Sequence, residues 1–311
     1  MSFALVFPGQ GSQSVGMMAG MDSNAIVRAT FAEASEVLDQ DIWKLAIDGP
    51  AEAQGLTINT QPLMLTAGVA MYRAWEDASG PRPDVLAGHS LGEYSAWVAA
   101  GAISFRDALP LVRVRAHAMQ EAVPVGTGAM AAILGLDDEA VRAACAEAAN
   151  GEIVEAVNYN APSQIVIAGH KSAVERAAAV AKAKGAKLAK ILPVSAPFHS
   201  SLLQPAAERL ASYLSSISIQ VPQIPVINNV DVTKVTDPAA IRDALSRQAC
   251  QPVRWVEIVH AIARDGATRL IECGPGRVLA GLTKRIEPAL ESLAVTDAVS
   301  LAHALFAVRS A

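Results

Sequence analysis

The fold is indicated most clearly by the stretch Val85-Leu86-Ala87-Gly88-His89-Ser90-Leu91-Gly92. Its first three residues predict a short buried strand, and the residues from Leu91 to about Ala100 predict a helix. Between them lies a G-x-S-x-G motif, which is typical of a strained strand-to-helix turn that exposes a serine hydroxyl. Glycine on either side of the serine lets the strand and the helix pack closely. The motif predicts an α/β fold with Ser90 as a nucleophile, and the alternative is an ordinary glycine-rich turn.

On both sides of this motif, short strand-like runs alternate with longer helical patterns. Strands are expected at residues 2–7, 85–87, 225–227 and 268–272. Helices are expected at residues 24–39, 60–78, 91–100, 104–122, 200–215, 238–247 and 253–264, and a glycine turn at 274–276 opens a last helix. This alternation indicates a parallel sheet that is covered by helices.

The pattern changes after the stretch 124–128, which contains a proline and two glycines. The elements expected beyond it are a strand (129–135), a helix (137–148), two strands (153–158 and 164–169), a helix (171–184) and a strand (187–192). This β-α-β-β-α-β order is that of a ferredoxin-like unit. We therefore expect a large α/β-hydrolase-like domain with a mostly parallel sheet, residues 1–127 and 195–311. It carries an inserted ferredoxin-like small domain, residues 128–194.

The composition excludes several classes of protein. Of the 311 residues, 52% are apolar and only 18% are charged, which is typical of a globular chain with a large core. A net charge of -5 argues against general binding to nucleic acid, which requires a basic face. The apolar stretches end before the ~20 residues of a membrane span. Cys145, Cys250 and Cys273 lack the spacing of metal ligands, so we expect reduced thiols, no metal site and a cytoplasmic protein.

A serine nucleophile requires a base, and histidine is the residue type that most often serves. His199 lies in a loop where the chain returns from the small domain, and junctions of this kind form clefts. His117 lies on a helix with two arginines, His170 ends a strand, and His260 and His303 lie in helical patterns. These positions are more typical of structural or solvated histidines. The spacing favours His199 but does not by itself exclude the others.

Several motifs occur in one order over nearly the whole chain. They are Pro8-Gly9-Gln10-Gly11-Ser12-Gln13, Gly88-His89-Ser90-Leu91-Gly92-Glu93-Tyr94, Arg115, Phe198-His199, Asn228-Asn229-Val230 and Glu272-Cys273-Gly274-Pro275-Gly276. Together they resemble the malonyl-CoA:acyl-carrier-protein transacylases, the stand-alone relatives of the acyltransferase domains of fatty-acid and polyketide synthases.

The resemblance implies a role for each matching residue. Ser90 attacks the thioester carbonyl, and His199 acts as general base and then as general acid. The backbone N–H groups of Gln10 and Leu91 form the oxyanion hole. Arg115 holds the malonyl carboxylate with its planar fork of donors.

The resemblance further implies that the family uses a Ser–His pair without an acidic third member. A main-chain carbonyl orients the imidazole, and Gln248 occupies the matching position. Phe198 is expected to favour a malonyl group by leaving little room for a branched acyl chain. His89 is expected either to line the pocket or to support the turn. An α/β-hydrolase would instead place an acidic residue between the serine and the histidine. Asp137 and Asp138 lie there, but helix N-capping explains them more simply.

The activity that the resemblance implies is transfer of malonyl from malonyl-CoA to the phosphopantetheine thiol of acyl carrier protein, by a ping-pong route, for fatty-acid or polyketide synthesis. No cofactor is expected, since CoA belongs to the substrate and phosphopantetheine to the carrier protein. Lys182, Lys184, Lys187, Lys190, Lys284 and Arg285 are candidates for receiving this acidic partner. One alternative is a serine thioesterase or esterase, which has no reason to bury Arg115. The other is a non-catalytic scaffold that binds carrier protein, which has no reason to keep the whole catalytic set.

Overall fold

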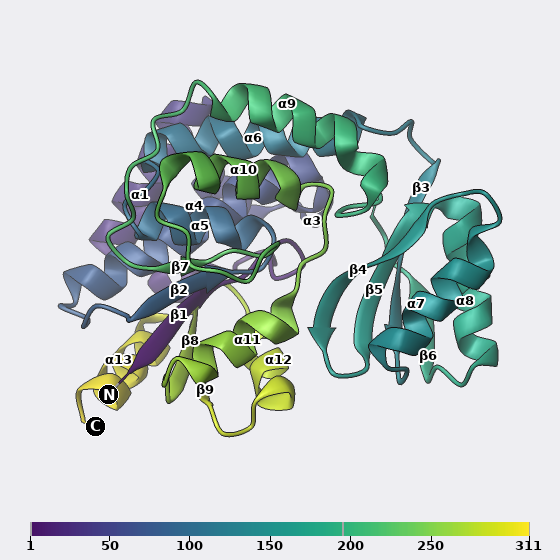
Figure 1. Cartoon of the computed structure of the whole chain (residues 1–311). Coiled ribbons are helices and arrows are strands. Elements are labelled where there is room, and N and C mark those ends of the chain that lie inside the picture. The colour runs from purple at the N-terminus through teal and green to yellow at the C-terminus, as the bar shows by residue number, and fades with distance from the viewer. Residues whose placement is uncertain (1, 195, 311) are drawn as a thin grey trace.

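A five-stranded sheet forms the centre of the larger part of the molecule (Figure 1). The computed structural model describes residues 2–194 and 196–310. The sheet order is β7-β2-β1-β8-β9, and neighbouring strands pair in parallel. The strands are β1 (Phe3–Phe7), β2 (Val85–Gly88), β7 (Val226–Ile227), β8 (Arg269–Cys273) and β9 (Glu291–Val295). The expected α/β fold with a mostly parallel sheet is therefore confirmed.

Helices cover both faces of this sheet, and residues along β1 alternate between the two cores. Phe3, Leu5 and Phe7 pack in one core, whereas Ala4 and Val6 pack in the other. The first core is covered by α1 (Ala25–Leu38), α4 (Thr57–Asp77), α5 (Leu91–Ala99), α6 (Phe105–Glu121), α9 (Gln204–Leu214) and α10 (Pro238–Gln248). The second is covered by α11 (Trp255–Arg264) and α12 (Val278–Ile286). Burial on both faces explains why the strands read as continuous apolar runs.

The expectation that the helix after residues 274–276 is the last one is wrong. That helix is α12, and the chain continues into β9 and then α13 (Ala298–Arg309). Strand β9 lies at the sheet edge and is only partly buried, so its sequence lacks a strong apolar run. Lys284 and Arg285 therefore lie on α12 and not on the final helix. Two short helices were also not expected, α2 (Ile42–Asp48) and α3 (Ala51–Gly55).

A second sheet of four antiparallel strands stands beside the first (Figure 1, right). Its order is β4-β5-β3-β6, and the helices α7 and α8 pack against it through a separate apolar core. The elements are β3 (Gly128–Leu134), α7 (Asp138–Ala149), β4 (Val154–Ala161), β5 (Gln164–His170), α8 (Lys171–Ala183) and β6 (Leu188–Ile191). All six elements expected between residues 129 and 192 are confirmed.

The second sheet also contacts the larger part of the molecule. Met130 and Val166 belong to the same apolar cluster as Phe198. Glu155 on β4 accepts hydrogen bonds from the backbone N–H and the hydroxyl of Ser201, at 2.8 and 2.9 Å. These contacts hold the second sheet beside the loop that carries His199.

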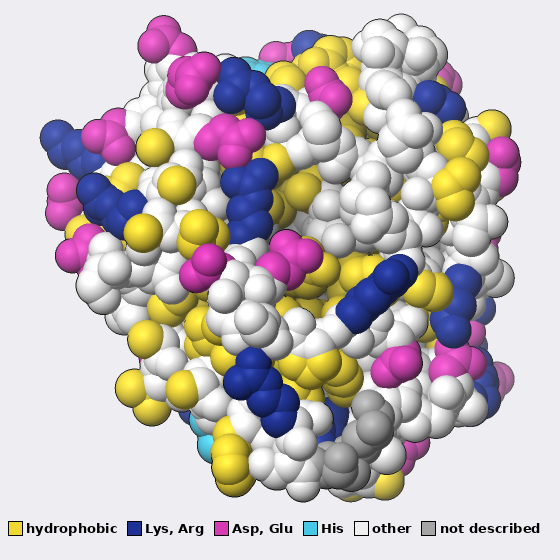
Figure 2. All heavy atoms as spheres, turned by 90° about the vertical axis from the view of Figure 1, so that its left-hand side faces the viewer, with side chains coloured by type: hydrophobic (Ala, Val, Ile, Leu, Met, Phe, Trp, Pro, Cys, Tyr) yellow, Lys and Arg dark blue, Asp and Glu magenta, His cyan; other side chains and the backbone are white. Residues whose placement is uncertain are grey.

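The surface opposite the second sheet carries mixed charge. Figure 2 shows basic and acidic side chains interspersed on this face, with apolar side chains between them. No helix within the described residues is long and apolar enough to cross a membrane.

Candidate active site

Ser90 lies at the sharp turn between β2 and α5, as the motif predicts. Its backbone has φ 52° and ψ −111°, a region that residues other than glycine seldom adopt. A Cβ atom on Gly88 would lie 2.0 Å from the backbone of Gly92, and one on Gly92 would lie 2.0 Å from the carbonyl oxygen of Phe7. Both glycines are therefore required by the close approach of the strand and the helix.

Ser90 and His199 are in direct contact. Ser90 Oγ lies 2.7 Å from His199 Nε2, and His199 Nδ1 lies 2.8 Å from the backbone carbonyl oxygen of Gln248. Because a carbonyl oxygen can only accept, Nδ1 carries the proton and Nε2 is left to accept the serine proton. Burial, and then the positive charge of Arg115, lowers the pKa of His199 to about 3. The imidazole is therefore neutral at pH 7 and can act as a base.

The remaining histidines do not share this position. The side chains of His117 and His260 are partly exposed and lie near Glu121 and Glu287. His170 Nδ1 accepts a hydrogen bond from the backbone N–H of Ile153, the residue before β4, at 2.9 Å. His89 lines the pocket, and its Nε2 lies 2.8 Å from Asn160 Oδ1. Of the six histidines, all within the described residues, only His199 forms a hydrogen bond with Ser90.

Arg115 reaches the nucleophile from α6. Its side chain is 1% exposed, and its guanidinium donates to Ser90 Oγ at 3.1 Å, to Gln61 Oε1 at 2.9 Å and to Gln248 Oε1 at 2.9 Å. In the described part of the chain, Arg115 Nε has no hydrogen-bond partner. The guanidinium also lies 5.2 Å from the centre of the Tyr94 ring. The protein thus holds a buried cation beside Ser90, with neutral amides rather than a carboxylate as its direct partners.

These residues line a cavity of about 130 Å³ between the two sheets. Its apolar lining comes from Met119, Met130, Val166, Leu192, Val194 and Phe198. Its polar lining comes from Gln10, Gln61, His89, Ser90, Arg115, Asn158 and His199. Phe198, which was expected to restrict the acyl group, lies in this wall and is 8% exposed.

Gln10 and Leu91 both line the cavity beside Ser90. Leu91 is the first residue of α5, where the backbone N–H groups have no acceptor within the helix. Among the described residues, neither the backbone N–H of Gln10 nor that of Leu91 donates a hydrogen bond. These two groups are therefore available to an oxygen atom of a ligand.

Asp137 caps a helix, as the simpler interpretation holds. Its side chain accepts a hydrogen bond from Ala140 N at 2.8 Å at the start of α7. The partner of His199 Nδ1 is instead the carbonyl of Gln248.

Sequence reasoning assigned no role to three polar side chains of the site, Gln61, Asn229 and Glu93, although the last two lie in motifs that carried the resemblance. Asn229 accepts a hydrogen bond from Ser90 N at 2.8 Å and donates to the carbonyl oxygen of Gly88 at 2.7 Å. Gln61 holds Arg115, and the carboxylate of Glu93 accepts from Gln248 Nε2 at 2.8 Å. The signal in the sequence is a polar residue within an otherwise apolar segment. In the structure, all three side chains are at most 2% exposed.

The three cysteines are free, and burial raises the pKa of the partly buried Cys250 thiol. Cys145 and Cys273 are buried, and burial raises the pKa of both thiols, that of Cys145 to about 12. The described residues contain no group of three or more His, Cys, Asp or Glu side chains that could hold a metal ion.

Residues 4–302 match the family described as the acyl transferase domain. The chain belongs to this acyl transferase family. Among curated relatives, it is 56% identical to the malonyl CoA-acyl carrier protein transacylase of Salmonella typhimurium over 97% of this chain and 98% of that protein. It is 45% identical to the protein of the same name from Bacillus subtilis over 94% of this chain and 93% of that protein.

Solved structures of other acyl transferases agree with the fold. The acyl-carrier-protein S-malonyltransferase of Burkholderia pseudomallei is 64% identical, with a TM-score of 0.97 over 98% of this chain and 99% of that chain. A malonyl-transacylase solved in complex with its type II PKS acyl-carrier protein is 53% identical, with a TM-score of 0.97 over 98% of this chain and 99% of that chain. In this acyl transferase, one cavity brings together the Ser90 hydroxyl, the His199 imidazole and the buried Arg115 guanidinium.

Proposed function

We propose that this chain transfers the malonyl group of malonyl-CoA to the phosphopantetheine thiol of acyl carrier protein, through an ester on Ser90. The observation that carries the proposal is the environment of one oxygen atom. Ser90 Oγ lies 2.7 Å from the neutral base His199 and 3.1 Å from the buried cation Arg115. The base supports acyl transfer, and the cation supports an acyl group that ends in a carboxylate.

The first half-reaction forms the acyl-enzyme. His199 Nε2 accepts the hydroxyl proton while Ser90 Oγ attacks the thioester carbonyl. The backbone N–H groups of Gln10 and Leu91 donate hydrogen bonds to the carbonyl oxygen that becomes negative. The positive end of the α5 dipole at Leu91 stabilises the same charge. When the carbon–sulfur bond breaks, His199 returns the proton to the sulfur of CoA.

The second half-reaction uses the same groups in reverse. His199 accepts the proton of the carrier thiol, the thiolate attacks the serine ester, and Ser90 recovers its proton as it leaves. The carbonyl of Gln248 keeps the imidazole oriented in both halves, since it binds the Nδ1 proton throughout. The acyl group thus moves from one thioester to another, with the serine ester as the intermediate between them.

Selection of the acyl group is assigned to Arg115 and Phe198. A carboxylate in an apolar cavity is unfavourable unless a cation and hydrogen bonds compensate for lost water. Arg115 supplies both, with the neutral partners Gln61 and Gln248 beside it. The ring of Phe198 in the cavity wall restricts a branch next to the carbonyl. This burial of Arg115 argues against a general esterase or thioesterase, and the assembled Ser90–His199 pair argues against a non-catalytic scaffold.

We also infer the domain organisation that the sequence suggested. Residues 128–194 are interpreted as a ferredoxin-like domain inserted into an α/β-hydrolase-like domain of residues 1–127 and 195–311; residues 1, 195 and 311 lie outside the described residues. The antiparallel order β4-β5-β3-β6 with two helices supports this interpretation. Three free cysteines support a cytoplasmic location.

Intact-mass measurement after mixing with malonyl-CoA alone tests the proposed function. One malonyl group should be added, on the peptide that carries Ser90, and Ser90→Ala should abolish it. Carrier protein should then remove the label and acquire the malonyl group. A label on a cysteine, or none at all, would refute the acyl-enzyme. Loss of the label to water as fast as to carrier protein would identify a thioesterase.

A further inference from the structure

Glu93 is a buried carboxylate for which the proposed reaction has no use. It lies in the first turn of α5, three residues after Ser90, and is 0% exposed. Burial raises the pKa of Glu93, whereas hydrogen bonds to its carboxylate lower it. A buried carboxylate is costly unless donors surround it, so its presence beside the nucleophile requires an explanation.

Three donors converge on this carboxylate. Its Oε2 accepts from Gln248 Nε2 at 2.8 Å and from the backbone N–H of Asn229 at 2.9 Å. Its Oε1 accepts from Trp97 Nε1 at 3.2 Å. Two of these donors belong to residues that touch Ser90 directly, since Gln248 Nε2 also donates to Ser90 O and Asn229 Oδ1 accepts from Ser90 N.

The side-chain amide of Gln248 connects the carboxylate to Arg115. Its Nε2 faces Glu93, and its Oε1 accepts from Arg115 at 2.9 Å. An anion on the donor side and a cation on the acceptor side fix the direction of the amide. Charge-assisted hydrogen bonds of this kind are stronger than neutral ones and reinforce one another along a chain. The guanidinium of Arg115 is thus held at Ser90 by a carboxylate that it does not contact.

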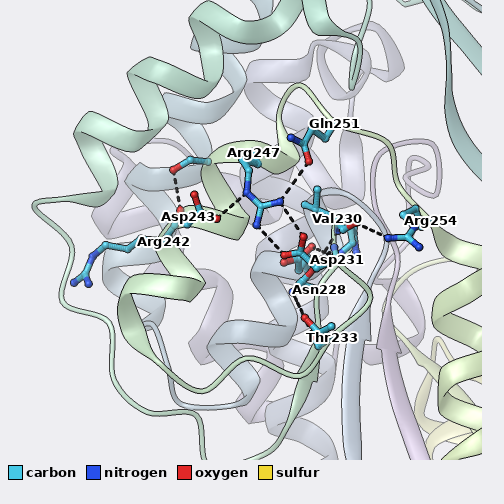
Figure 3. A network of polar contacts seen from close by, with 12 residues as sticks. Asn228, Val230, Asp231, Thr233, Arg242, Asp243, Arg247, Gln251 and Arg254 are labelled. Carbon is cyan, nitrogen blue, oxygen red and sulfur yellow. Dashed lines mark hydrogen bonds and ion pairs between the residues drawn. The ribbon is translucent and has the colours of Figure 1, made fainter.

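An ion pair also joins the two elements that carry Gln248 and Asn229. Figure 3 shows Arg247, at the end of α10, in a bidentate ion pair with Asp231 in the loop after β7, with distances of 3.0 and 2.8 Å. Asp231 N in turn donates to Asn228 Oδ1 at 2.7 Å. In this partly exposed pair, Arg247 is adjacent to Gln248 in the sequence and Asp231 lies two residues after Asn229, and both lie outside the cavity. The ion pair therefore links the end of α10, which carries Gln248, to the loop that carries Asn229.

We propose that Glu93 is a positioning residue that holds Arg115 at Ser90 through the side-chain amide of Gln248, and so sets the preference for a charged acyl group. This inference rests on the proposed function. Without the anion, the amide of Gln248 loses the charge that orients it, and Arg115 loses a fixed acceptor. The base is affected less, because His199 is oriented by the backbone carbonyl of Gln248 rather than by its side chain.

Glu93→Gln is the sharpest variant because it changes one atom. If the new amide oxygen occupies the place of Oε2, Asn229 and Gln248 keep an acceptor, but an NH₂ group faces the N–H of Trp97. If the amide is turned, the NH₂ group faces the two other donors. In either case the negative charge is lost. We expect the ratio of malonyl to acetyl acylation of Ser90 to fall about tenfold, within the usual effect of residues that act through a network.

Two further variants complete the experiment. Gln248→Met removes the amide but keeps the backbone carbonyl that binds His199, so it should lower the same ratio. Because both residues act through one chain of contacts, the double variant should lower the ratio no further than the stronger single variant. Glu272→Gln is the matched control: Glu272 is also 0% exposed, but it accepts from Ala280 N at the start of α12. Its ratio should equal that of the wild-type protein.

Acylation from malonyl-CoA and from acetyl-CoA is measured by rapid quench and intact mass, with thermal unfolding to confirm that each variant folds. An unchanged ratio in folded Glu93→Gln, an equal fall in Glu272→Gln, or additive effects in the double variant would overturn the inference. Should Glu93→Gln not fold, an unchanged ratio in Gln248→Met would overturn it. If the wild-type protein forms no malonyl ester, the proposed function itself fails, which is a distinct result.

Discussion

Replacing Arg115 by alanine should remove most malonyl transfer. Arg115 is 1% exposed, and it donates to Ser90 Oγ at 3.1 Å, so an acyl group on Ser90 lies within its reach. Removing one partner of a buried charge pair costs about 3–5 kcal/mol, because the remaining charge is left uncompensated. At about 1.4 kcal/mol per factor of ten, acylation from malonyl-CoA should slow by about 10²–10⁴-fold.

Acetyl transfer provides the internal comparison for this variant. An acetyl group has no carboxylate, so its transfer should persist in Arg115→Ala or improve, since an unpaired cation no longer lies beside it. Arg115→Lys should recover only part of the malonyl activity, because an ammonium group cannot reproduce the planar fork of donors. Both acyl donors are followed by the mass of the acyl-enzyme at short times.

Arg113 supplies the matched control on the same helix. It donates to the carbonyl oxygen of Leu38 at 2.9 Å and to Gln40 Oε1 at 2.6 Å, away from Ser90. Arg113→Ala should therefore leave the ratio of malonyl to acetyl transfer unchanged. If Arg115→Ala lost both activities in equal proportion, Arg115 would support the fold rather than bind the substrate carboxylate.

Three other predictions follow from the site and its surroundings. His199→Ala should slow acylation by about 10²–10⁴-fold for both acyl donors, whereas Asp137→Asn with Asp138→Asn should leave the rate nearly unchanged; a collapse in the folded double variant would indicate a hydrolase-type triad. The pKa of His199 is about 3 in the folded protein and about 6.5 in an unfolded chain. Below pH 6.5, the unfolded chain therefore binds more protons than the folded protein does. Stability should therefore decrease from pH 6.5 toward 3, by up to about 5 kcal/mol from this residue, and His199→Gln should flatten the curve in urea denaturation; an unchanged curve would contradict the assignment. Charge reversal at Lys182, Lys184, Lys187 and Lys190, or at Lys284 and Arg285, should raise KM for carrier protein, more at low salt, without slowing acylation by malonyl-CoA; equal effects on both substrates would exclude these residues from docking.

The parts of the site that the sequence could predict are those that depend on local geometry. Gly88 and Gly92 are needed because a Cβ atom at either would lie 2.0 Å from backbone atoms. The clash at Gly88 is with Gly92 and is local, whereas the clash at Gly92 is with Phe7 on β1. The glycine pattern itself spans five consecutive residues, so the turn and its serine can be recognised without the fold. His199 and Arg115 required more: their roles came from a resemblance, and the loop or helix around each of them left alternatives.

The roles that the sequence alone did not indicate depend on contacts between distant segments. Asn229 meets Ser90 across 139 positions in the sequence, and Gln248 meets Glu93 across 155. No periodic pattern marks such a pair. Asn229 and Glu93 lie in motifs that carried the resemblance, but a motif does not indicate which distant residue each side chain contacts. The end of the chain was misread for another reason. Strand β9 lies at an edge with one face only partly buried, so its residues lack the apolar run that identified the inner strands.

The topology explains why these distant residues meet. Gln10 follows β1, Ser90 follows β2 and Asn229 follows β7, and these strands are neighbours in a parallel sheet. The carboxyl ends of parallel strands lie at one edge, so three loops from different parts of the chain must converge there. The helices then supply the charges, Arg115 from α6 and Glu93 from α5. Burial keeps His199 neutral, and the backbone carbonyl of Gln248 orients its imidazole. Neither effect requires a carboxylate hydrogen-bonded to the imidazole. In the proposed mechanism, base catalysis and acyl choice belong to separate groups, so changes at His199 should slow both acyl donors, whereas changes at Arg115 or Glu93 should alter their ratio.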